Sequence, residues 1–245
     1  MPAKSSKPRR ERDSLSRELI LDAARTIAER DGLAGLTFQA IGSELGAHPT
    51  SVYRHFRDKD ELLLDLIDHL RARSYGGELV HGPDWRDDLR LLARVIHDHY
   101  LRYPSFAVQM AARTTRRPTE FGTVEFAAEA LLRAGLSPES AAICLRALGN
   151  YTRSAASIEA SVLALDERTR QADNLAWQVE YRQLDPERYP AIGQLDGNLT
   201  TIGDPSAFWA GLELLLDGIA AQAERESAGP APRPARPRSR SQPPS

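Results

Sequence analysis

Apolar residues recur along most of the chain at spacings of three and four, which is the period of an amphipathic α-helix. The stretch from Ile20 to Ala28 is one example, and Gly32 is suited to end that helix. The segments 137–163 and 204–224 have the same period, and each opens on a Ser-Pro or Asp-Pro pair typical of a helix start. No segment alternates with period two over more than a few residues. The pattern therefore predicts an all-α fold.

Two short helices are predicted within residues 37–56, joined by a tight turn at Gly46. Ile41 lies on the inner face of the first, Pro49 suits the first turn of the second, and Val52 and Phe56 point inward. This is the spacing of a helix-turn-helix, whose second helix enters the major groove of DNA. The alternative is an ordinary helical hairpin whose polar residues are solvated.

Polar side chains remain outward on the second short helix, and they are our candidate DNA contacts. Short hydroxyls and Tyr53 suit phosphate contacts, whereas Arg54 can bind guanine O6 and N7 through two hydrogen bonds. Lys59 lies at the start of the next predicted helix, where backbone N–H groups also favour a phosphate. The candidates from this surface are Pro49, Thr50, Ser51, Tyr53, Arg54, His55 and Lys59.

Composition narrows the class of protein. The 245 residues are 41% hydrophobic and 27% charged, which is sufficient for a soluble globular core. We expect no membrane span, because no window reaches about 18 uncharged apolar residues, and no secretory signal, because no apolar stretch follows the first basic residues. A single cysteine, Cys144, excludes an intrachain disulfide and favours a cytoplasmic setting. In its apolar surroundings this thiol is expected to be buried and inert.

The net charge of −2 conceals an uneven distribution. Residues 1–12 and residues 227–245 each carry +4, which leaves −10 for the chain between them. Both ends lack apolar periodicity, so we expect a disordered basic arm over 1–13 and a disordered Pro/Arg-rich tail over 227–245. An acidic body does not bind nucleic acid by bulk charge, so any contact must be local. The arm could reach DNA beside the helix-turn-helix, and the tail could touch DNA or serve only to solubilise the chain.

The motifs L-T, I-G, L-G, V-Y-R-H-F and K-x-x-L-L follow one another between residues 36 and 63. With them, residues 16–70 resemble the DNA-binding domain of TetR-family transcriptional regulators. Segments at 123–125, 149–152, 185–190 and 208–219 resemble the C-terminal domain of tetracycline-repressor-like members. The resemblance implies an all-helical homodimer in the cytoplasm that binds operator DNA, holds a small ligand in each subunit and is released by it. It also adds Gln39 to the DNA contacts.

The ligand implied by this resemblance differs from tetracycline. Tetracycline repressors bind a magnesium–drug chelate through a pocket histidine, but the corresponding segment around Met110 has none. Asn150 replaces a second pocket histidine, and Ile158 an acidic residue. We therefore expect a mainly apolar organic ligand, with no metal and no cofactor. The candidate ligand contacts are His99, Tyr103, Met110, Arg113, Asn150, Ile158 and Trp177.

The resemblance suggests a division into a DNA-binding domain at 14–75 and a ligand-binding and dimerisation domain at 76–226. Residues 138–163 and 205–224 are expected to form the dimer interface, the latter through the stripe Leu212, Leu216 and Ile219. Residues 58–74 would connect the two functions. The alternative is a helical small-molecule-binding protein without sequence-specific DNA activity. An enzyme is disfavoured, because no catalytic motif is present.

Several other residues have two interpretations. His97 and His99 flank Asp98, but residues two apart on a helix point to different faces and cannot chelate together. Each tryptophan could line a pocket or pack in a core or interface. Residues 167–183 are predicted to be helical, with Leu175, Val179 and Tyr181 as candidate buried positions, and 185–204 to be rich in turns. The tryptophans that could either line a pocket or pack in a core or interface are Trp85, Trp177 and Trp209.

Overall fold

The computed structural model describes residues 15–77, 79–195 and 197–228. These residues form helices and contain no β-strand, as the apolar period predicts. The proposed disordered ends lie outside them, apart from Ser227, which ends the last helix, and Ala228. In chain order the helices are α1 (Arg17–Gly35), α2 (Phe38–Leu45), α3 (Pro49–Tyr53), α4 (Lys59–Tyr75), α5 (Trp85–Arg102), η1 (Pro104–Phe106), α6 (Ala107–Ala112), α7 (Pro118–Arg133), α8 (Pro138–Leu163), α9 (Glu167–Leu175), η2 (Ala176–Glu180), η3 (Tyr181–Gln183), α10 (Pro190–Leu195) and α11 (Pro205–Ser227).

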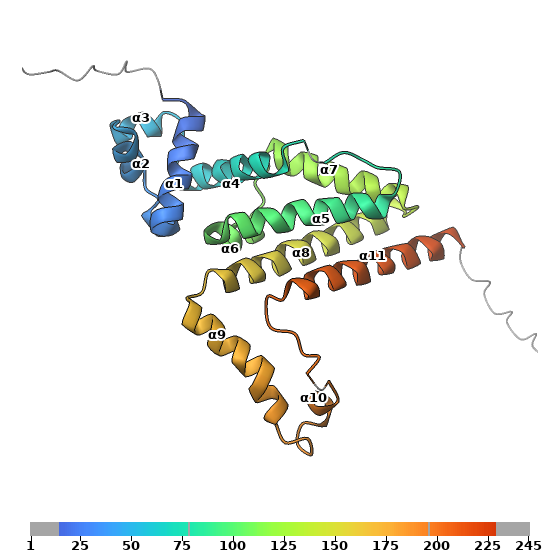
Figure 1. The fold of residues 1–245 in the computed structure, drawn as a ribbon. Helices are drawn as coiled ribbons and strands as arrows, with labels where there is room; N and C mark the ends of the chain where they lie inside the picture. Colours follow the sequence, from blue (N-terminus) through green and yellow to red (C-terminus); the bar gives the residue numbers. More distant parts are fainter. Residues whose placement is uncertain (1–14, 78, 196, 229–245) are drawn as a thin grey trace, which may run out of the picture.

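Helices α1, α2 and α3 gather at one end of the molecule (Figure 1). They begin where the sequence predicts: Thr37 Oγ1 accepts a hydrogen bond from the Ala40 backbone N–H at 3.0 Å. The side chains of Ile27, Ile41 and Val52 are fully buried between them. Because these helices are short, this shared apolar core, rather than intrinsic helix propensity, stabilises them.

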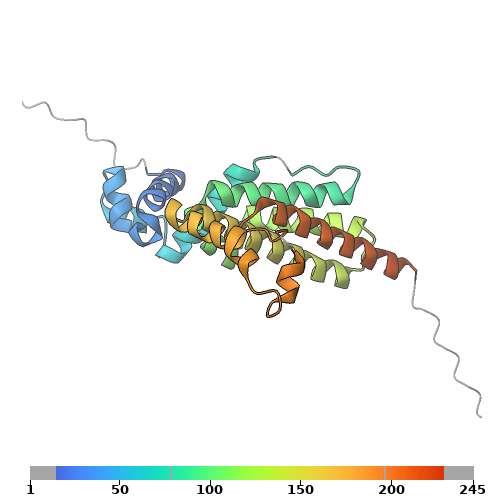
Figure 2. The ribbon, with the colours of Figure 1, turned by 60° about the horizontal axis from the view of Figure 1, so that its bottom comes forward.

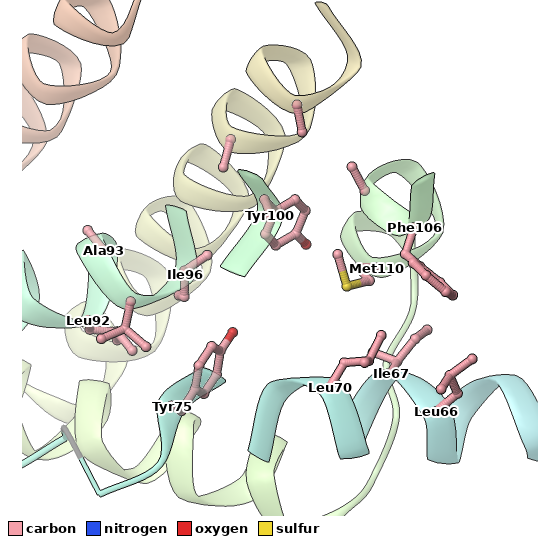
Figure 3. Close-up of a cluster of buried hydrophobic side chains, with 14 of the residues drawn as sticks. Leu66, Ile67, Leu70, Tyr75, Leu92, Ala93, Ile96, Tyr100, Phe106 and Met110 are labelled. Atoms are coloured by element: carbon pink, nitrogen blue, oxygen red, sulfur yellow. The ribbon is translucent and has the colours of Figure 1, made fainter. Parts of the chain in front are cut away.

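Helix α4 leaves this end and enters a bundle in which α8 packs against α5, α7 and α11 (Figures 1 and 2). Figure 3 shows the join: Ile67 and Leu70 of α4 face Met110 of α6, and Ile96 of α5 lies further along. Met110, Ile67 and Leu70 are fully buried. The two ends of the molecule are thus linked by a continuous apolar core along α4.

One expectation about α11 is wrong. Leu212 and Leu216 are fully buried within the protomer, and Ile219 is 5% exposed, so this stripe forms the core and not a free interface. The large apolar side chains that α11 does expose are Leu214, at 75%, and Trp209, at 36%. Periodicity identifies an apolar stripe but does not tell whether the helix partner belongs to the same chain or to another.

Residues 164–204 project from the bundle and carry α9, η2, η3 and α10 (Figures 1 and 2). The helical prediction for 167–183 is confirmed, with π and 3₁₀ geometry in its second half. The prediction that this segment is buried is wrong: Leu175 is 56% and Val179 38% exposed, and Tyr181 is half-buried. The segment has apolar positions, but the bundle of its own chain does not cover them.

Candidate functional site

The turn between α2 and α3 places two short helices close together. Gly46 adopts a left-handed conformation with φ of 62°, which glycine accepts at no steric cost. A Cβ atom at Gly42 would lie 2.8 Å from the Ala47 carbonyl oxygen, so the close approach of the two helices needs glycine there. Both positions belong to the I-G and L-G motifs of the sequence. The local chain geometry is therefore that of a helix-turn-helix.

The predicted DNA contacts lie on α2, on α3, in the turn after α3 and at the start of α4. Gln39, Thr50, Tyr53, Arg54 and Lys59 are exposed. The remaining three, Pro49, Ser51 and His55, are half-buried. Arg54 and His55 lie in the turn that follows α3.

Local contacts orient several of these side chains. The Tyr53 ring packs edge-on against Phe38, with centroids 4.5 Å apart, while the residue is 59% exposed. Lys59 Nζ donates to the Leu33 carbonyl oxygen at 2.9 Å, so its ammonium group is already engaged within the domain. His48 was not among the predicted residues: its Nδ1 accepts from the Thr50 backbone N–H at 3.3 Å and caps α3. A side-chain acceptor directly before Pro49 was the signal for that cap.

A cavity of about 470 Å³ lies between α4, α5, α7 and α8 and is partly open to solvent on the side of Phe121 and Val124, which are 61% and 47% exposed. Its wall is mainly apolar, with Arg71 and Tyr75 from α4, Tyr100 from α5 and Arg153 from α8 as prominent polar groups. The other lining residues are Leu89, Leu92, Ala93, Ile96, Thr114, Glu120, Phe121, Thr123, Val124, Glu125, Ala127, Leu145, Arg146, Leu148, Gly149 and Thr152.

Burial governs the protonation of the cavity's two tyrosines. It raises the pKa of Tyr75 and of Tyr100 above the ordinary value for a phenol, although the charges of Arg71 and Arg153 act in the opposite direction. Both hydroxyls therefore keep their protons near neutral pH and can donate a hydrogen bond. Figure 3 shows the hydroxyls of the two rings pointing into the space between α4 and α5.

The predicted ligand contacts do not line this cavity. His99, Tyr103 and Met110 do lie together, beside it. The His99 ring meets the Tyr103 ring at a centroid distance of 5.3 Å, and its Nε2 lies 3.1 Å from Met110 Sδ. His99 is fully buried, and desolvation lowers its pKa to about 3. Arg71 and Arg102 add to that shift.

The other predicted ligand contacts lie apart from that cluster. Arg113 pairs with Asp60 of α4 at 2.8 Å. Asn150 and Ile158 lie on the exposed side of α8. Trp177 stacks on Tyr181 in the projecting segment, at a smaller pocket of about 220 Å³. The role of these residues as ligand contacts stays a prediction.

The wall residues themselves were not predicted, although some signals were present. Leu89, Leu92, Ala93 and Ile96 follow the helical period, and the pattern of a cavity wall is the same as that of a filled core. The arginines at 71, 146 and 153, set within apolar stretches, were the distinctive feature.

Two histidines of α5 have polar partners inside the bundle. His97 Nε2 lies 2.8 Å from Glu159 Oε2, whereas His99 Nδ1 lies 2.8 Å from Ser74 Oγ, so the two histidines face different groups as predicted. Over residues 15–77, 79–195 and 197–228, no group of three or more His, Cys, Asp or Glu could hold a metal ion.

The expected burial of Cys144 and of the tryptophans can be compared with the structure. Cys144 is only half-buried, with the pKa of its thiol raised by desolvation, so the expectation of full burial is wrong. Trp85 and Trp177 are half-buried and Trp209 is 36% exposed.

In the described part of the chain, no helix is both long and apolar enough to cross a membrane.

A helix-turn-helix with an exposed polar surface, joined to a helical bundle with a cavity between its helices, defines a DNA-binding regulator. The sequence matches the family described as "Bacterial regulatory proteins, tetR family" over residues 20–66. It matches "Tetracyclin repressor-like, C-terminal domain" over residues 80–223. The chain therefore belongs to the TetR family of transcriptional regulators.

Full-length relatives agree with this assignment. An HTH-type transcriptional regulator of Saccharopolyspora erythraea is 30% identical over 223 residues, covering 90% of this chain and 91% of that protein. The transcriptional repressor DrrR1 of Streptomyces coeruleorubidus is 27% identical over 235 residues, covering 93% and 84%. The solved TetR regulator SCO7222 of Streptomyces coelicolor superposes with a TM-score of 0.72 at 27% identity, covering 85% and 99%. The names of these relatives describe regulators of transcription.

Proposed function

We propose that this protein is a homodimeric repressor that leaves its operator when a small organic ligand enters the 470 Å³ cavity. The observation that carries the proposal is the position of α4, which belongs to both sites. It begins at Lys59, beside the helix-turn-helix, and its last turns supply Arg71 and Tyr75 to the cavity wall. A ligand that shifts this helix would also shift the DNA-binding surface.

Operator binding is assigned to the surface of α2 and α3 with the turn that follows. Arg54 is exposed, whereas the neighbouring Arg57 is paired with Asp58 at 2.9 Å. The exposed arginine is therefore available to bind a base edge, while Thr50, Ser51 and His55 are placed to contact the phosphate backbone. Repression is supported by the relative DrrR1, whose name describes a repressor.

Ion pairs connect α4 both to α1 at the DNA-binding end and to the segments beside α6 and α7 in the bundle. Asp65 accepts from Arg17 Nε of α1 at 2.7 Å and from Arg117 Nε, before α7, at 2.8 Å. Asp60 pairs with Arg113, which follows α6. A ligand that favours one position of α7 over another would act on α1 through Asp65. The required differential affinity is on the order of 1–3 kcal/mol, as in other allosteric proteins.

Dimerisation is assigned to the exposed faces of α8 and α11. Ile143 and Ile158 on α8 are 64% and 51% exposed, and Leu214 on α11 is 75% exposed. Apolar side chains of this size on two adjacent helices favour a partner surface. A two-fold dimer would present two α3 helices to successive major grooves. The division at residues 75 and 76 into DNA-binding and ligand-binding domains, and a cytoplasmic location, belong to this proposal.

The test is selection of operator sequences from a random pool of duplex DNA by the full-length protein. We expect an inverted repeat to be enriched, and fluorescence anisotropy to show tight binding to it that Arg54→Ala weakens. Arg94→Ala, at an exposed position of α5, is the matched control and should bind like the wild type. Failure to enrich any sequence would favour the alternative, a helical ligand-binding protein without sequence-specific DNA activity.

A further inference from the structure

The cavity has an apolar body and a buried polar group at the end formed by α4, while Glu125 and Arg146 lie at exposed positions of the lining. The α5 wall presents Leu89, Leu92 and Ile96, and the α8 wall presents Leu145 and Leu148. A volume of about 470 Å³ lies within the range of about 300–1,000 Å³ usual for organic ligands. The polar groups at the α4 end therefore decide which class of organic molecule this wall accepts.

Two deeply buried groups at that end have donors without acceptors. Tyr100 is fully buried, and its hydroxyl has no hydrogen-bond partner among the described residues. Arg71 is 5% exposed, and its Nε–H is likewise unpartnered, although Nη2 donates to the Met110 carbonyl oxygen at 3.3 Å. Arginine cannot accept a hydrogen bond, so Arg71 does not satisfy the tyrosine proton. Buried polar groups in proteins are almost always paired, which points to an acceptor supplied from the cavity.

Positive charge is concentrated at the same place. Arg71 and Arg153 both act on the Tyr75 and Tyr100 hydroxyls, lowering the pKa of each against the larger effect of burial. Arg153 donates to the Gly149 carbonyl oxygen at 2.9 Å and to Asn150 Oδ1 at 3.4 Å, and it has no carboxylate partner among the described residues. It therefore brings an uncompensated charge to the wall.

The carboxylates nearby are engaged or set apart. Glu120 Oε1 lies 4.0 Å from Arg71 Nη1, while its Oε2 accepts from the Arg116 backbone N–H at 2.7 Å. Glu125 lies at an exposed position of the wall. Asp68, one turn before Arg71, is outside the lining; burial raises its pKa, and the charge of Arg71 acts on it in the opposite direction. The wall itself carries three arginines and two glutamates, an excess of one positive charge.

We propose that the cavity binds a monoanionic organic acid whose carboxylate accepts hydrogen bonds from the Tyr100 hydroxyl and the Arg71 guanidinium. The apolar part of the molecule lies between α5 and α8, and Arg153 contributes charge. Hydrogen bonds between a carboxylate and an arginine are charge-assisted and stronger than neutral ones. This inference rests on the proposed function in taking the cavity as the effector site.

The experiment compares anthracene-9-carboxylic acid with anthracene-9-carboxamide, which has the same shape and no charge. Binding of each to the full-length protein is measured by isothermal titration calorimetry at pH 7.5 without DNA. We expect the acid to bind at least about tenfold more tightly than the amide, as a charged hydrogen bond implies. Tyr100→Phe and Arg71→Gln should each reduce this preference about tenfold, whereas amide affinity changes little.

Matched controls exclude indirect effects. Tyr189→Phe lies in the projecting segment and Arg94→Gln on the exposed side of α5, and neither residue lines the cavity. Both variants should keep the preference of the wild type for the acid. If Arg71→Gln fails to fold, Tyr100→Phe still decides, because it removes only a hydroxyl. Equal affinities, a tighter amide, or no binding of either compound would overturn the proposal.

A separate measurement distinguishes this inference from the proposed function. The acid is titrated into the protein–operator complex while fluorescence anisotropy follows the DNA. Acid that binds with the stated preference but leaves the operator bound would refute ligand release and leave the ligand class standing. Release of DNA by the amide and the acid at equal concentrations would support ligand release and refute the ligand class.

Discussion

The helix-turn-helix and the cavity hold their functional residues in opposite ways. The predicted DNA contacts all lie within residues 39–59, on two short helices, in the turn that follows the second of them and at the start of the next helix. The cavity wall is drawn from residues 71–153 and from four long helices. Side chains of the first site face solvent, whereas those at the polar end of the second are buried. A site made by local spacing can be found in the sequence, but a site made by packing cannot.

The largest effect is expected from breaking the dimer, because the helical bundle then no longer holds two helix-turn-helix domains on one operator. Ile158→Glu combined with Leu214→Glu places two charges on the exposed apolar face of α8 and α11. We expect the dimer to dissociate and operator affinity to fall on the order of 100-fold or more, because a single recognition helix binds one half-site. Light scattering and anisotropy would measure both effects.

Val108→Glu, at a 60% exposed position of α6, is the control for adding a charge to an exposed apolar site. It should leave both the dimer and operator binding intact. A double variant that remains dimeric at micromolar concentration would show that the interface lies elsewhere.

The next largest effect is expected from a change in the helix-turn-helix alone. Arg54→Ala should cost about 1–3 kcal/mol of operator binding free energy and relax the preference at one base position, if Arg54 contacts a base. Binding of anthracene-9-carboxylic acid should not change, because Arg54 is remote from the cavity wall. Anisotropy on the selected operator and on its single-base variants is the measurement. Wild-type affinity in this variant would remove Arg54 from the contact surface.

The buried side chain of His99, beside the cavity, provides a test in the helical bundle. The folded-state pKa of His99, about 3, lies below its ordinary value of 6.5, so the unfolded chain binds the proton first as pH falls. The resulting stability is present above pH 6.5 and is lost as pH falls toward 3. Between pH 7 and pH 5 this loss amounts to about 2 kcal/mol of unfolding free energy.

Urea unfolding at the two pH values checks this prediction. In His99→Gln the part of the pH dependence that is due to His99 should disappear, so the free energy of unfolding should fall less than in the wild type. The same drop in both proteins would place the protonation elsewhere.

The smallest effect is expected at Lys59. Its ammonium group already donates to the Leu33 carbonyl oxygen at 2.9 Å, so a phosphate must compete with that bond. Lys59→Ala should weaken binding to all DNA sequences alike and lower the salt dependence by about one counterion. Lys59→Arg should retain the slope. A loss confined to one operator sequence would argue that Lys59 contacts a base.

The helix-turn-helix shows how far local information reaches. Ile41, Val52 and Phe56 are buried as their spacing predicts, and Gly46 turns the chain as expected. These outcomes depend on the helical period, on capping and on the steric freedom of glycine, all of which act over a few residues. Two features were missed there, and both are equally local: His48 caps α3, and α3 ends at Tyr53, so Arg54 and His55 lie in the turn after it.

The bundle shows where that information ends. Leu212 and Leu216 were predicted for the interface and lie in the core, and Val179 was predicted to be buried and is exposed. The three have the apolar character and spacing that their predictions required. What differs is the surface that each helix meets, and that is set by contacts between segments far apart in the chain.

The sequence by itself determined the helical class, the helix starts and the helix-turn-helix with its exposed polar residues, because hydrophobic period, caps and turn residues act within one or two helical turns. Only the tertiary structure decided that Arg71, Tyr100 and Arg153 meet at one cavity and that His99 packs beside it. A cavity is a place where the packing of several helices leaves space. Its wall residues have the same period and polarity as core residues, so their difference exists only after the helices are assembled.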